Sequence, residues 1–467
     1  MNKNRMIVQQ SSGNTEEVIH LAYTFRGGIH VEEYKNTRQC PIEIMTPPKT
    51  VCIPLSQHIG APAVPCVAKG DTVSVGQKIG EVPEKALGCP VHASVSGTVV
   101  DIIKKVIPSG AAVEHIVIEN DGLGTLCPDC KPVTEKLTDI PNEEIIRLVR
   151  DAGISGMGGA AFPTYAKIQS ALGKVDQLII NCAECEPFIT ANHRLMLEHP
   201  DDIIGGVKIL LKVLGVHNAS IAVENNKMDA VRTLEEELGG DDLISVKVMK
   251  TKYPQGDERQ LIYALTGREI PTGKLPADVG CVIFNAETTA SVYKAFAFGT
   301  PVVSRIVTVD GDCIKEPKNL LVPIGTRVSD IIETCGGFVR QPERMINGGP
   351  MMGNAQWDAE MPVTKSTSAI LFFSDKFGRK QVKTPTCIHC GKCVRNCPMH
   401  LMPMYIAQYS MIGDLASAET YGAMSCVECG SCTYNCPGGV EIVQHIRVAK
   451  AAIRTEKARL AALNKKD

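Results

Sequence analysis

The sequence predicts a multidomain α/β protein, in which small β units accompany a domain of alternating strands and helices and a cysteine-rich helical module follows. The chain has 467 residues, too many for one ordinary domain, and 44% of them are apolar, enough for several cores. The spacing of turn signals and apolar runs changes along the chain. Finally, the chain has 19 cysteines, and eight of them gather near its C-terminus.

The N-terminal part, residues 24–135, is predicted to be a small β unit. Val51–Lys104 is rich in Val and Ile and is interrupted at short intervals by turn signals such as Gly70-Asp71 and Gly76-Gln77. This rhythm resembles the barrel-sandwich hybrid of biotinyl and lipoyl carriers. Those carriers need a lysine at a hairpin tip, and the matching stretch Gly88–Ala93 has none. We therefore expect a scaffold and not a swinging arm.

Residues 140–300 are predicted to form a Rossmann-like α/β domain with a largely parallel sheet. The expected strands are Gln177–Asn181, Ala219–Val223, Ser245–Met249 and Val282–Asn285. The expected helices are Glu143–Asp151, Asp201–Leu214, Lys227–Leu238 and Glu258–Thr266.

Residues 301–375 are predicted to hold a β-grasp unit and a connector. Strands are expected at Ile306–Val309 and Leu320–Ile324, with a helix at Val328–Thr334. The Gly- and Met-rich stretch Arg340–Ser374 is expected to be the connector.

Two cysteine runs near the C-terminus each follow the pattern C-x2-C-x2-C-x3-C, with a proline after the fourth cysteine. The pattern is typical of [4Fe–4S] ferredoxins, in which the fourth cysteine of each run binds the other cluster. Structural zinc sites use C-x2-C pairs instead. We therefore assign Cys387, Cys390, Cys393 and Cys436 to one cluster, and Cys426, Cys429, Cys432 and Cys397 to the other. This motif predicts an electron-transfer protein.

The ferredoxin module is predicted to span residues 380–450 and to be rich in helices, because Met404–Met411 and Leu415–Tyr421 between the runs have helical patterns. A basic tail, residues 451–467, follows; we expect a solvated helix face there, or less often a docking face for anionic lipid or an acidic partner. No apolar run is long enough to cross a bilayer, and the net charge of −2 gives no general attraction to nucleic acid.

A ligand pocket is predicted where a glycine loop and three polar turns meet. The loop is Gly156–Thr164, and its glycines allow the close backbone approach that suits a phosphate at a helix N-terminus. The turns Asn181–Pro187, Tyr253–Glu258 and Asn285–Thr288 each follow an expected strand. Because ligands of such domains collect at the carboxyl ends of strands, we expect one pocket, where acids meet ribose hydroxyls and amides meet a heterocycle.

These four segments resemble the flavin-binding subunit of respiratory complex I. The domain order, together with Phe25–His30 and Pro54–Pro62, is closer still to the C subunit of the Rnf complex. That resemblance implies the peripheral, NAD-facing subunit of a translocase on the cytoplasmic side of the cell membrane. The complex is an ion-translocating ferredoxin–NAD+ oxidoreductase that moves Na+ or H+, so the implied partners are membrane and ferredoxin-like Rnf subunits, with ferredoxin itself reached indirectly.

The resemblance also implies roles for individual residues. Nine would contact FMN: Gly156, Gly158, Gly159, Lys167, Asn181, Tyr253, Gly256, Asp257 and Asn285. Three would lie near the nicotinamide nucleotide of NAD(H): Phe162, Glu184 and Glu258. Complex I has an aspartate where this chain has Ala183 and an asparagine where it has Phe284.

The predicted function is electron transfer between two [4Fe–4S] clusters, FMN and NAD(H). A nicotinamide carries two electrons as hydride and a cluster accepts one, so a flavin must lie between them. No catalytic acid or base is expected. The alternatives are an iron–sulfur electron carrier without flavin, an electron carrier associated with proline reduction, and a cofactor-carrier or ligand-sensing protein, which the missing tip lysine disfavours.

Overall fold

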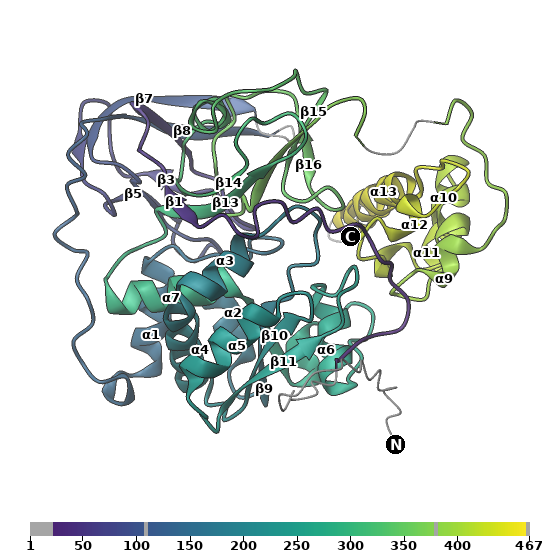
Figure 1. Cartoon of the computed structure of the whole chain (residues 1–467), viewed down its shortest axis with the longest axis horizontal. Helices are drawn as coiled ribbons and strands as arrows, with labels where there is room; N and C mark the ends of the chain where they lie inside the picture. Colours follow the sequence, from purple (N-terminus) through teal and green to yellow (C-terminus); the bar gives the residue numbers. More distant parts are fainter. Residues whose placement is uncertain (1–21, 107–110, 378–381, 464–467) are drawn as a thin grey trace, which may run out of the picture.

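The computed structural model describes residues 22–106, 111–377 and 382–463. Two β units lie at the top of Figure 1, the α/β domain lies below them, and the ferredoxin module lies at the right. The N-terminal segment, residues 22–41, passes from the α/β domain along the ferredoxin module to the β units. No helix among the described residues is long and apolar enough to cross a membrane.

The expected N-terminal β unit consists of two small sheets. One has the order β2-β8-β7-β4, and the other has the order β3-β5-β6. Their strands are β2 (Thr50–Pro54), β3 (Val64–Pro65), β4 (Thr72–Val73), β5 (Lys78–Glu81), β6 (Val91–His92), β7 (Gly97–Val106) and β8 (Ala112–Asn120). Alternate residues of both sheets, among them Ile53, Ile79 and Ile116, are fully buried in one core, which explains the dense Val and Ile pattern.

The stretch that would carry a swinging arm is fixed in this fold. The thiol of Cys89 is buried and donates to the carbonyl of Ile154 (3.4 Å). The buried ammonium of Lys365 donates to the carbonyls of Pro90 (2.8 Å) and Gly153 (2.7 Å). These contacts join the first β unit, the second β unit and the segment before the glycine loop, as a scaffold would.

The α/β domain has the expected parallel sheet, with the strand order β11-β10-β9-β12. The strands are β9 (Gln177–Cys182), β10 (Ala219–Glu224), β11 (Ile244–Met249) and β12 (Cys281–Asn285). The helices are α1 (Asn142–Asp151), α2 (Thr164–Ala171), α3 (Ala191–Glu198), α4 (Pro200–Leu214), α5 (Met228–Leu238), α6 (Glu258–Thr266) and α7 (Ala286–Ala297). Every strand and helix whose bounds were predicted in this domain is confirmed to within one residue, and α2 is the helix expected to follow the glycine loop, whereas α3 and α7 were not predicted.

The second β unit has a six-stranded sheet with the order β1-β14-β13-β17-β15-β16. Its elements are β1 (Ile42–Ile44), β13 (Ser304–Asp310), β14 (Lys318–Pro323), α8 (Val328–Thr334), β15 (Arg344–Asn347), β16 (Asn354–Gln356) and β17 (Ala369–Phe373). The connector expected at Arg340–Ser374 is wrong, because this stretch contributes three strands. Its apolar run Ala369–Phe373 is a fully buried strand, and the Gly- and Met-rich residues only form a turn. Residues 42–44, which we had placed in the N-terminal unit, pair with β14.

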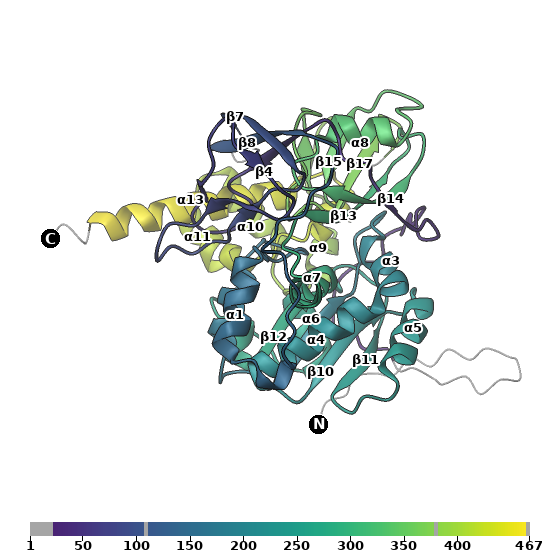
Figure 2. The ribbon, with the colours of Figure 1, turned by 90° about the vertical axis from the view of Figure 1, so that its left-hand side faces the viewer.

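The ferredoxin module is helical, as expected. Its helices are α9 (Lys392–Arg395), α10 (Pro403–Met411), α11 (Leu415–Thr420), α12 (Ser431–Tyr434) and α13 (Ile442–Leu463). The short helices α9 and α12 occupy equivalent places in the two cysteine runs. Figure 2 shows α13 extending well beyond the rest of the molecule.

Candidate functional site

The strand order of the parallel sheet reverses between β9 and β12, which are neighbours although they are far apart in the chain. In open α/β sheets, ligands bind outside the carboxyl ends of the strands at such a reversal. Asn181 of β9 and Asn285 of β12 are register partners at this point. The Asn181 amide donates to the carbonyl of Gly256 (2.8 Å), and the Asn285 side chain caps α7 by accepting from the N–H of Glu287 (2.9 Å). Two predicted FMN-contact residues thus stand side by side.

The glycine loop lies against Asn285. Its base is closed by a hydrogen bond from the Gly156 N–H to the Phe162 carbonyl (2.9 Å). A Cβ on Gly158 would stand 2.6 Å from the Asn285 Nδ2 atom, whereas a Cβ on Gly159 would meet nothing within 4 Å. Gly158, Gly159 and Ala160 are exposed, and no acceptor in the described ranges pairs with their backbone N–H groups. Free N–H donors on a loop that lacks side chains fit a phosphate group.

A buried cation is hydrogen-bonded to the backbone of the glycine loop. Arg305 of β13 is 1% exposed and donates through Nη2 to the Met157 carbonyl (3.1 Å). Its Nη1 lies 3.2 Å from a carboxylate oxygen of Glu287, whose other oxygen accepts from the N–H of Ile306 (2.9 Å). Burial lowers the pKa of Arg305, and Glu287 opposes that shift. Sequence reasoning missed Arg305 because it belongs to the second β unit and lies in no recognisable motif.

Lys167 and the start of α6 belong to the ligand site expected from the sequence. The Lys167 ammonium stands 5.5 Å from the centroid of the Phe284 ring. Burial lowers the pKa of Lys167, and the charge of nearby Glu258 opposes the shift. Asp257 caps α6 by accepting from the N–H groups of Arg259 (3.0 Å) and Gln260 (3.2 Å), and burial raises its pKa to about 6. Lys167 can therefore provide a positive charge near the glycine loop, with Glu258 close to it.

Tyr253 connects the α/β domain to the ferredoxin module. Its side chain is 1% exposed, and its hydroxyl donates to the carbonyl of Cys429 (2.7 Å). Burial raises the pKa of the Tyr253 phenol, so the hydroxyl keeps its proton as a donor. Tyr253 also exchanges both backbone hydrogen bonds with Ile29 (2.8 Å each). Tyr253, which we expected near the flavin ring, therefore holds the backbone of a predicted cluster cysteine.

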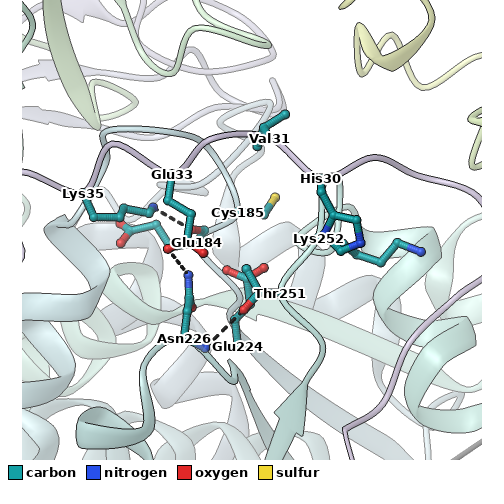
Figure 3. A pocket seen from close by; sticks show the side chains of 10 residues that line it. All are labelled: His30, Val31, Glu33, Lys35, Glu184, Cys185, Glu224, Asn226, Thr251 and Lys252. Atoms are coloured by element: carbon teal, nitrogen blue, oxygen red, sulfur yellow. Dashed lines mark hydrogen bonds between the residues drawn. The ribbon is translucent and has the colours of Figure 1, made fainter. Parts of the chain in front are cut away.

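Glu184 lines a pocket that does not include Glu258. Its carboxylate accepts from the N–H groups of Asn192 (2.8 Å) and His193 (3.4 Å) at the start of α3. Burial raises the pKa of Glu184, and the charges of Lys35 and Lys227 oppose this shift. The Lys35 ammonium donates to the carbonyls of residues 184, 186 and 189. Figure 3 shows this pocket, which is lined by His30, Val31, Glu33, Lys35, Glu184, Cys185, Glu224, Asn226, Thr251 and Lys252.

One of the two predicted sets of cluster cysteines lines a single cavity, and part of the other set lies close together. Cys397 of the first run lines one cavity with Cys426, Cys429 and Cys432 of the second run, and this is the crossed set expected from the motif. In the other set, Cys387 lies close enough to Cys393 to influence its pKa. No three His, Cys, Asp or Glu side chains of the described residues converge as ligands of one metal ion. The thiolates of a cubane cluster bind different irons and therefore stand farther apart than the ligands of a single ion.

The set around Cys397 faces the α/β domain. The Gly28 N–H donates to the carbonyl of Asn396 (3.1 Å), and a Cβ on Gly27 would stand 2.7 Å from the carbonyl oxygen of Cys397. The Gln260 amide contacts the sulfur of Met399 (3.3 Å). The stretch Phe25–His30 thus fills the space between the first cysteine run and the Tyr253 turn, which explains its two glycines.

Comparison with known proteins gives matches to four family models. A Nuo51 FMN-binding domain matches residues 149–294, an RnfC barrel-sandwich hybrid domain 23–123, an SLBB domain 306–355 and a 4Fe-4S dicluster domain 386–441. The C subunit of a Na+-translocating ferredoxin:NAD+ oxidoreductase complex from Acetobacterium woodii is 46% identical over 433 residues, which are 92% of this chain and 97% of the relative.

This chain belongs to the RnfC family. The C subunit of the proton-translocating complex from Clostridium ljungdahlii is 44% identical over 437 residues, covering 92% of this chain and 94% of that one. Among solved structures, a chain of an NAD+-reducing [NiFe]-hydrogenase is 19% identical, with a TM-score of 0.47, over 60% of this chain and 53% of that chain. The resemblance stated from the sequence is confirmed, and the RnfC chain contains an FMN-binding domain and an iron–sulfur domain.

Two positions of this RnfC chain depart from the complex I pattern. Phe284 takes the place of an asparagine, and its ring lies beneath the Lys167 ammonium. At the other position, the Ala183 carbonyl oxygen would stand 2.4 Å from a Cβ on Gly256. Gly256 is thus required by close backbone packing. Phe162 is 37% exposed at the end of the glycine loop.

Proposed function

We propose that this chain is the subunit that oxidises NADH or reduces NAD+ in a membrane-bound, ion-translocating ferredoxin:NAD+ oxidoreductase complex. It holds FMN and two [4Fe–4S] clusters and attaches peripherally, on the cytoplasmic side, through other Rnf subunits. Two of its relatives are named for different ions, Na+ and H+. We therefore assign ion transport and the choice of ion to the partner subunits.

The observation that carries this proposal is the hydrogen bond from Tyr253 to the carbonyl of Cys429. It places a cluster cysteine against the same turn that leads into Asp257 and α6, and the charge of Asp257 also acts on Cys429. The cluster of Cys397, Cys426, Cys429 and Cys432 is therefore the one next to the flavin pocket. The cluster of Cys387, Cys390, Cys393 and Cys436 is the farther one.

The residues of the expected flavin site support this order of flavin, nearer cluster and farther cluster. The free N–H groups of Gly158 and Gly159 and the Lys167 ammonium bind the FMN phosphate, while Asn181 and Asn285 at the switch point present amides to the ring system. When bound, FMN exchanges two electrons as hydride with NAD(H) and single electrons with the clusters. The chain itself holds the cofactors in place and excludes water from the buried turn at Tyr253.

An anaerobic reconstitution tests the proposal. The full chain is loaded with iron, sulfide and FMN and then mixed with NADH, and flavin and cluster absorbance are followed separately. We expect both chromophores to bleach. Cluster-loaded, folded protein that takes up no FMN and whose clusters NADH does not reduce would contradict the proposal and favour the electron carrier without flavin.

A further inference from the structure

A pair of cysteines outside the two cluster runs lies in the linker that follows β8. Cys127 and Cys130 have the C-x2-C spacing and enclose Pro128 and Asp129. Both cysteines are free thiols and partly exposed, and the two residues between them are exposed. Reactive cysteines are partly exposed in this way, whereas structural thiols are buried. The pair is therefore accessible to reagents in solution.

The pair closes a tight turn of the backbone. The Cys130 N–H donates to the Cys127 carbonyl (2.9 Å), which is the hydrogen bond of a β-turn. The Cα atoms at the two ends of such a turn are less than about 7 Å apart. A disulfide joins Cα atoms that are about 4.4–6.8 Å apart. The backbone thus brings the two cysteines to about the spacing that a bond between their sulfur atoms needs.

The two thiols also interact with each other. Burial, the charges of Cys127 and Asp129, and a hydrogen bond between the two thiols raise the pKa of the Cys130 thiol. Cys130 therefore keeps its proton at neutral pH. Because the two side chains are hydrogen-bonding partners, the sulfur atoms lie on the same side of the turn.

The rest of the fold holds this turn in place. The Cys127 N–H donates to the carbonyl of Val75 (2.8 Å), in the N-terminal β unit. At the other end of the turn, a Cβ on Gly76 would stand 2.5 Å from the Cys130 Sγ atom. The absence of a side chain at Gly76 thus provides the space in which the Cys130 sulfur lies, next to its partner.

A second pair with the same spacing has a different environment. Cys182 is 0% exposed in β9, and the Sγ atom of Cys185 accepts a hydrogen bond from the Gly256 N–H (3.4 Å). Burial raises the pKa of both thiols. The C-x2-C spacing alone therefore does not make a reactive pair, and the exposed turn is what distinguishes Cys127 and Cys130.

A metal site does not account for the exposed pair. Zinc usually takes four protein ligands in a structural site. Within the described ranges, no third His, Cys, Asp or Glu side chain joins Cys127 and Cys130 as a ligand of one ion.

We propose that Cys127 and Cys130 are a redox-active dithiol, which a low-molecular-weight disulfide oxidises reversibly to an intramolecular disulfide. The Cys127 thiolate attacks one sulfur of the small disulfide, whose S–S bond breaks and releases a thiolate. Cys130 then attacks the Cys127 sulfur, and the second small thiolate leaves. Two electrons pass from the cysteine pair to the small disulfide, and both thiol protons end on the released thiols. A disulfide on an exposed turn is readily reduced by the reverse exchange.

Mass spectrometry of the full, cofactor-loaded chain tests this inference. The anaerobic protein is incubated with glutathione disulfide, its remaining thiols are alkylated with iodoacetamide, and its peptides are mapped. We expect the peptide that contains Cys127 and Cys130 to lack both alkyl groups and to be lighter than the reduced peptide by both thiol hydrogens. Dithiothreitol should restore the alkylation of both residues.

Controls come from the same chain. Cys66 is an exposed single cysteine of the N-terminal β unit and should carry glutathione without forming an internal disulfide. Cys182 and Cys185 should stay reduced. The variant Cys130→Ser should trap glutathione on Cys127. The variant Cys127→Ser should react more slowly, because the remaining thiol keeps its proton. Iron content and flavin absorbance should be unchanged in both variants.

Three outcomes would overturn the inference. One is a pair that stays fully alkylated under conditions in which Cys66 carries glutathione. Another is glutathione on both Cys127 and Cys130 with no bond between them, which would make them independent thiols. The third is stoichiometric zinc in the unmodified chain that is lost in Cys127→Ser, which would assign the pair to a metal site. Because the test uses neither NADH nor ferredoxin, its result is independent of the proposed function.

Discussion

Substitution of Gly159 should change flavin affinity without lowering the stability of the flavin-free chain. A Cβ at this residue meets nothing within 4 Å, so Gly159→Ala removes no contact and creates no clash in the flavin-free chain. Its unfolding free energy should be unchanged, or higher by about 0.4–1 kcal/mol because the unfolded chain loses freedom. If the FMN phosphate rests on this loop, the new methyl group occupies part of its place.

The size of the flavin effect follows from the hydrogen bonds that are lost. A hydrogen bond to a charged group is worth about 1.5–3 kcal/mol. Loss of one such bond from the loop N–H groups to the phosphate therefore predicts about 10- to 150-fold weaker FMN binding. The assay is a fluorescence titration of FMN with the cluster-loaded chain, next to thermal unfolding of the flavin-free chain.

Two matched variants complete this test. Gly158→Ala places a Cβ 2.6 Å from the Asn285 amide, so it should lower stability even without flavin. Ser170→Ala changes an exposed side chain of α2 and should alter neither quantity. Unchanged FMN affinity in Gly159→Ala would refute the placement of the phosphate on this loop.

Three further predictions concern the buried turn and the clusters. Tyr253→Phe leaves the Cys429 carbonyl without its donor, so the cluster-loaded chain should lose about 1–3 kcal/mol of unfolding free energy; an unchanged melting temperature would contradict the contact. Glu186 is a largely buried acid whose Oε1 atom has no hydrogen-bond partner among the described residues, and burial raises its pKa to about 7 from 4.5. Its contribution to stability is therefore full below about pH 4.5 and is lost as pH rises through about 7, so the stability of the unmodified chain relative to Glu186→Gln should fall by at most about 3 kcal/mol over that range in urea titrations; parallel pH profiles would exclude this role. The loaded chain should contain about eight iron and eight sulfide per chain by chemical analysis, and half these amounts would mean a single cluster.

The α/β domain could be predicted well because its strands are buried on both faces. Continuous apolar runs such as Leu178–Ile180 and Ile221–Val223 between polar turns left little ambiguity. Helix α7 was missed because its sequence contains Thr, Val and aromatic residues of low helix propensity. Packing in the core stabilises that helix, and this packing cannot be seen in local sequence, whereas the Asn285 cap is a local signal that went unused.

The cluster motif could be predicted because its spacing is dictated by the ligands, and the gathering of Cys397 with the second run agrees with it. The positions of Glu184 and Tyr253 could not be predicted. Both lie in turns at strand ends, and the N-terminal segment of residues 22–41 is hydrogen-bonded to both turns. Lys35 holds the carbonyls of the Glu184 turn, and Ile29 holds Tyr253 against the ferredoxin module.

Such long-range contacts leave no periodic signal in the sequence. The wrong placement of residues 42–44 has the same origin, because these residues join a sheet whose other strands lie far along the chain. A strand of three residues at the edge of a sheet also has too few positions to show an alternating pattern.

The central claim is that electrons pass between NAD(H) and the farther cluster by way of the cluster next to the flavin pocket. Rapid mixing of NADH with two cysteine variants tests this claim most directly. In Cys397→Ser, which removes a ligand of the nearer cluster, NADH should still bleach the flavin but should no longer reduce the remaining cluster at the rate of the unmodified chain. In Cys390→Ser, NADH should reduce both the flavin and the nearer cluster. Normal reduction of the remaining cluster in Cys397→Ser, together with its loss in Cys390→Ser, would contradict the proposed order.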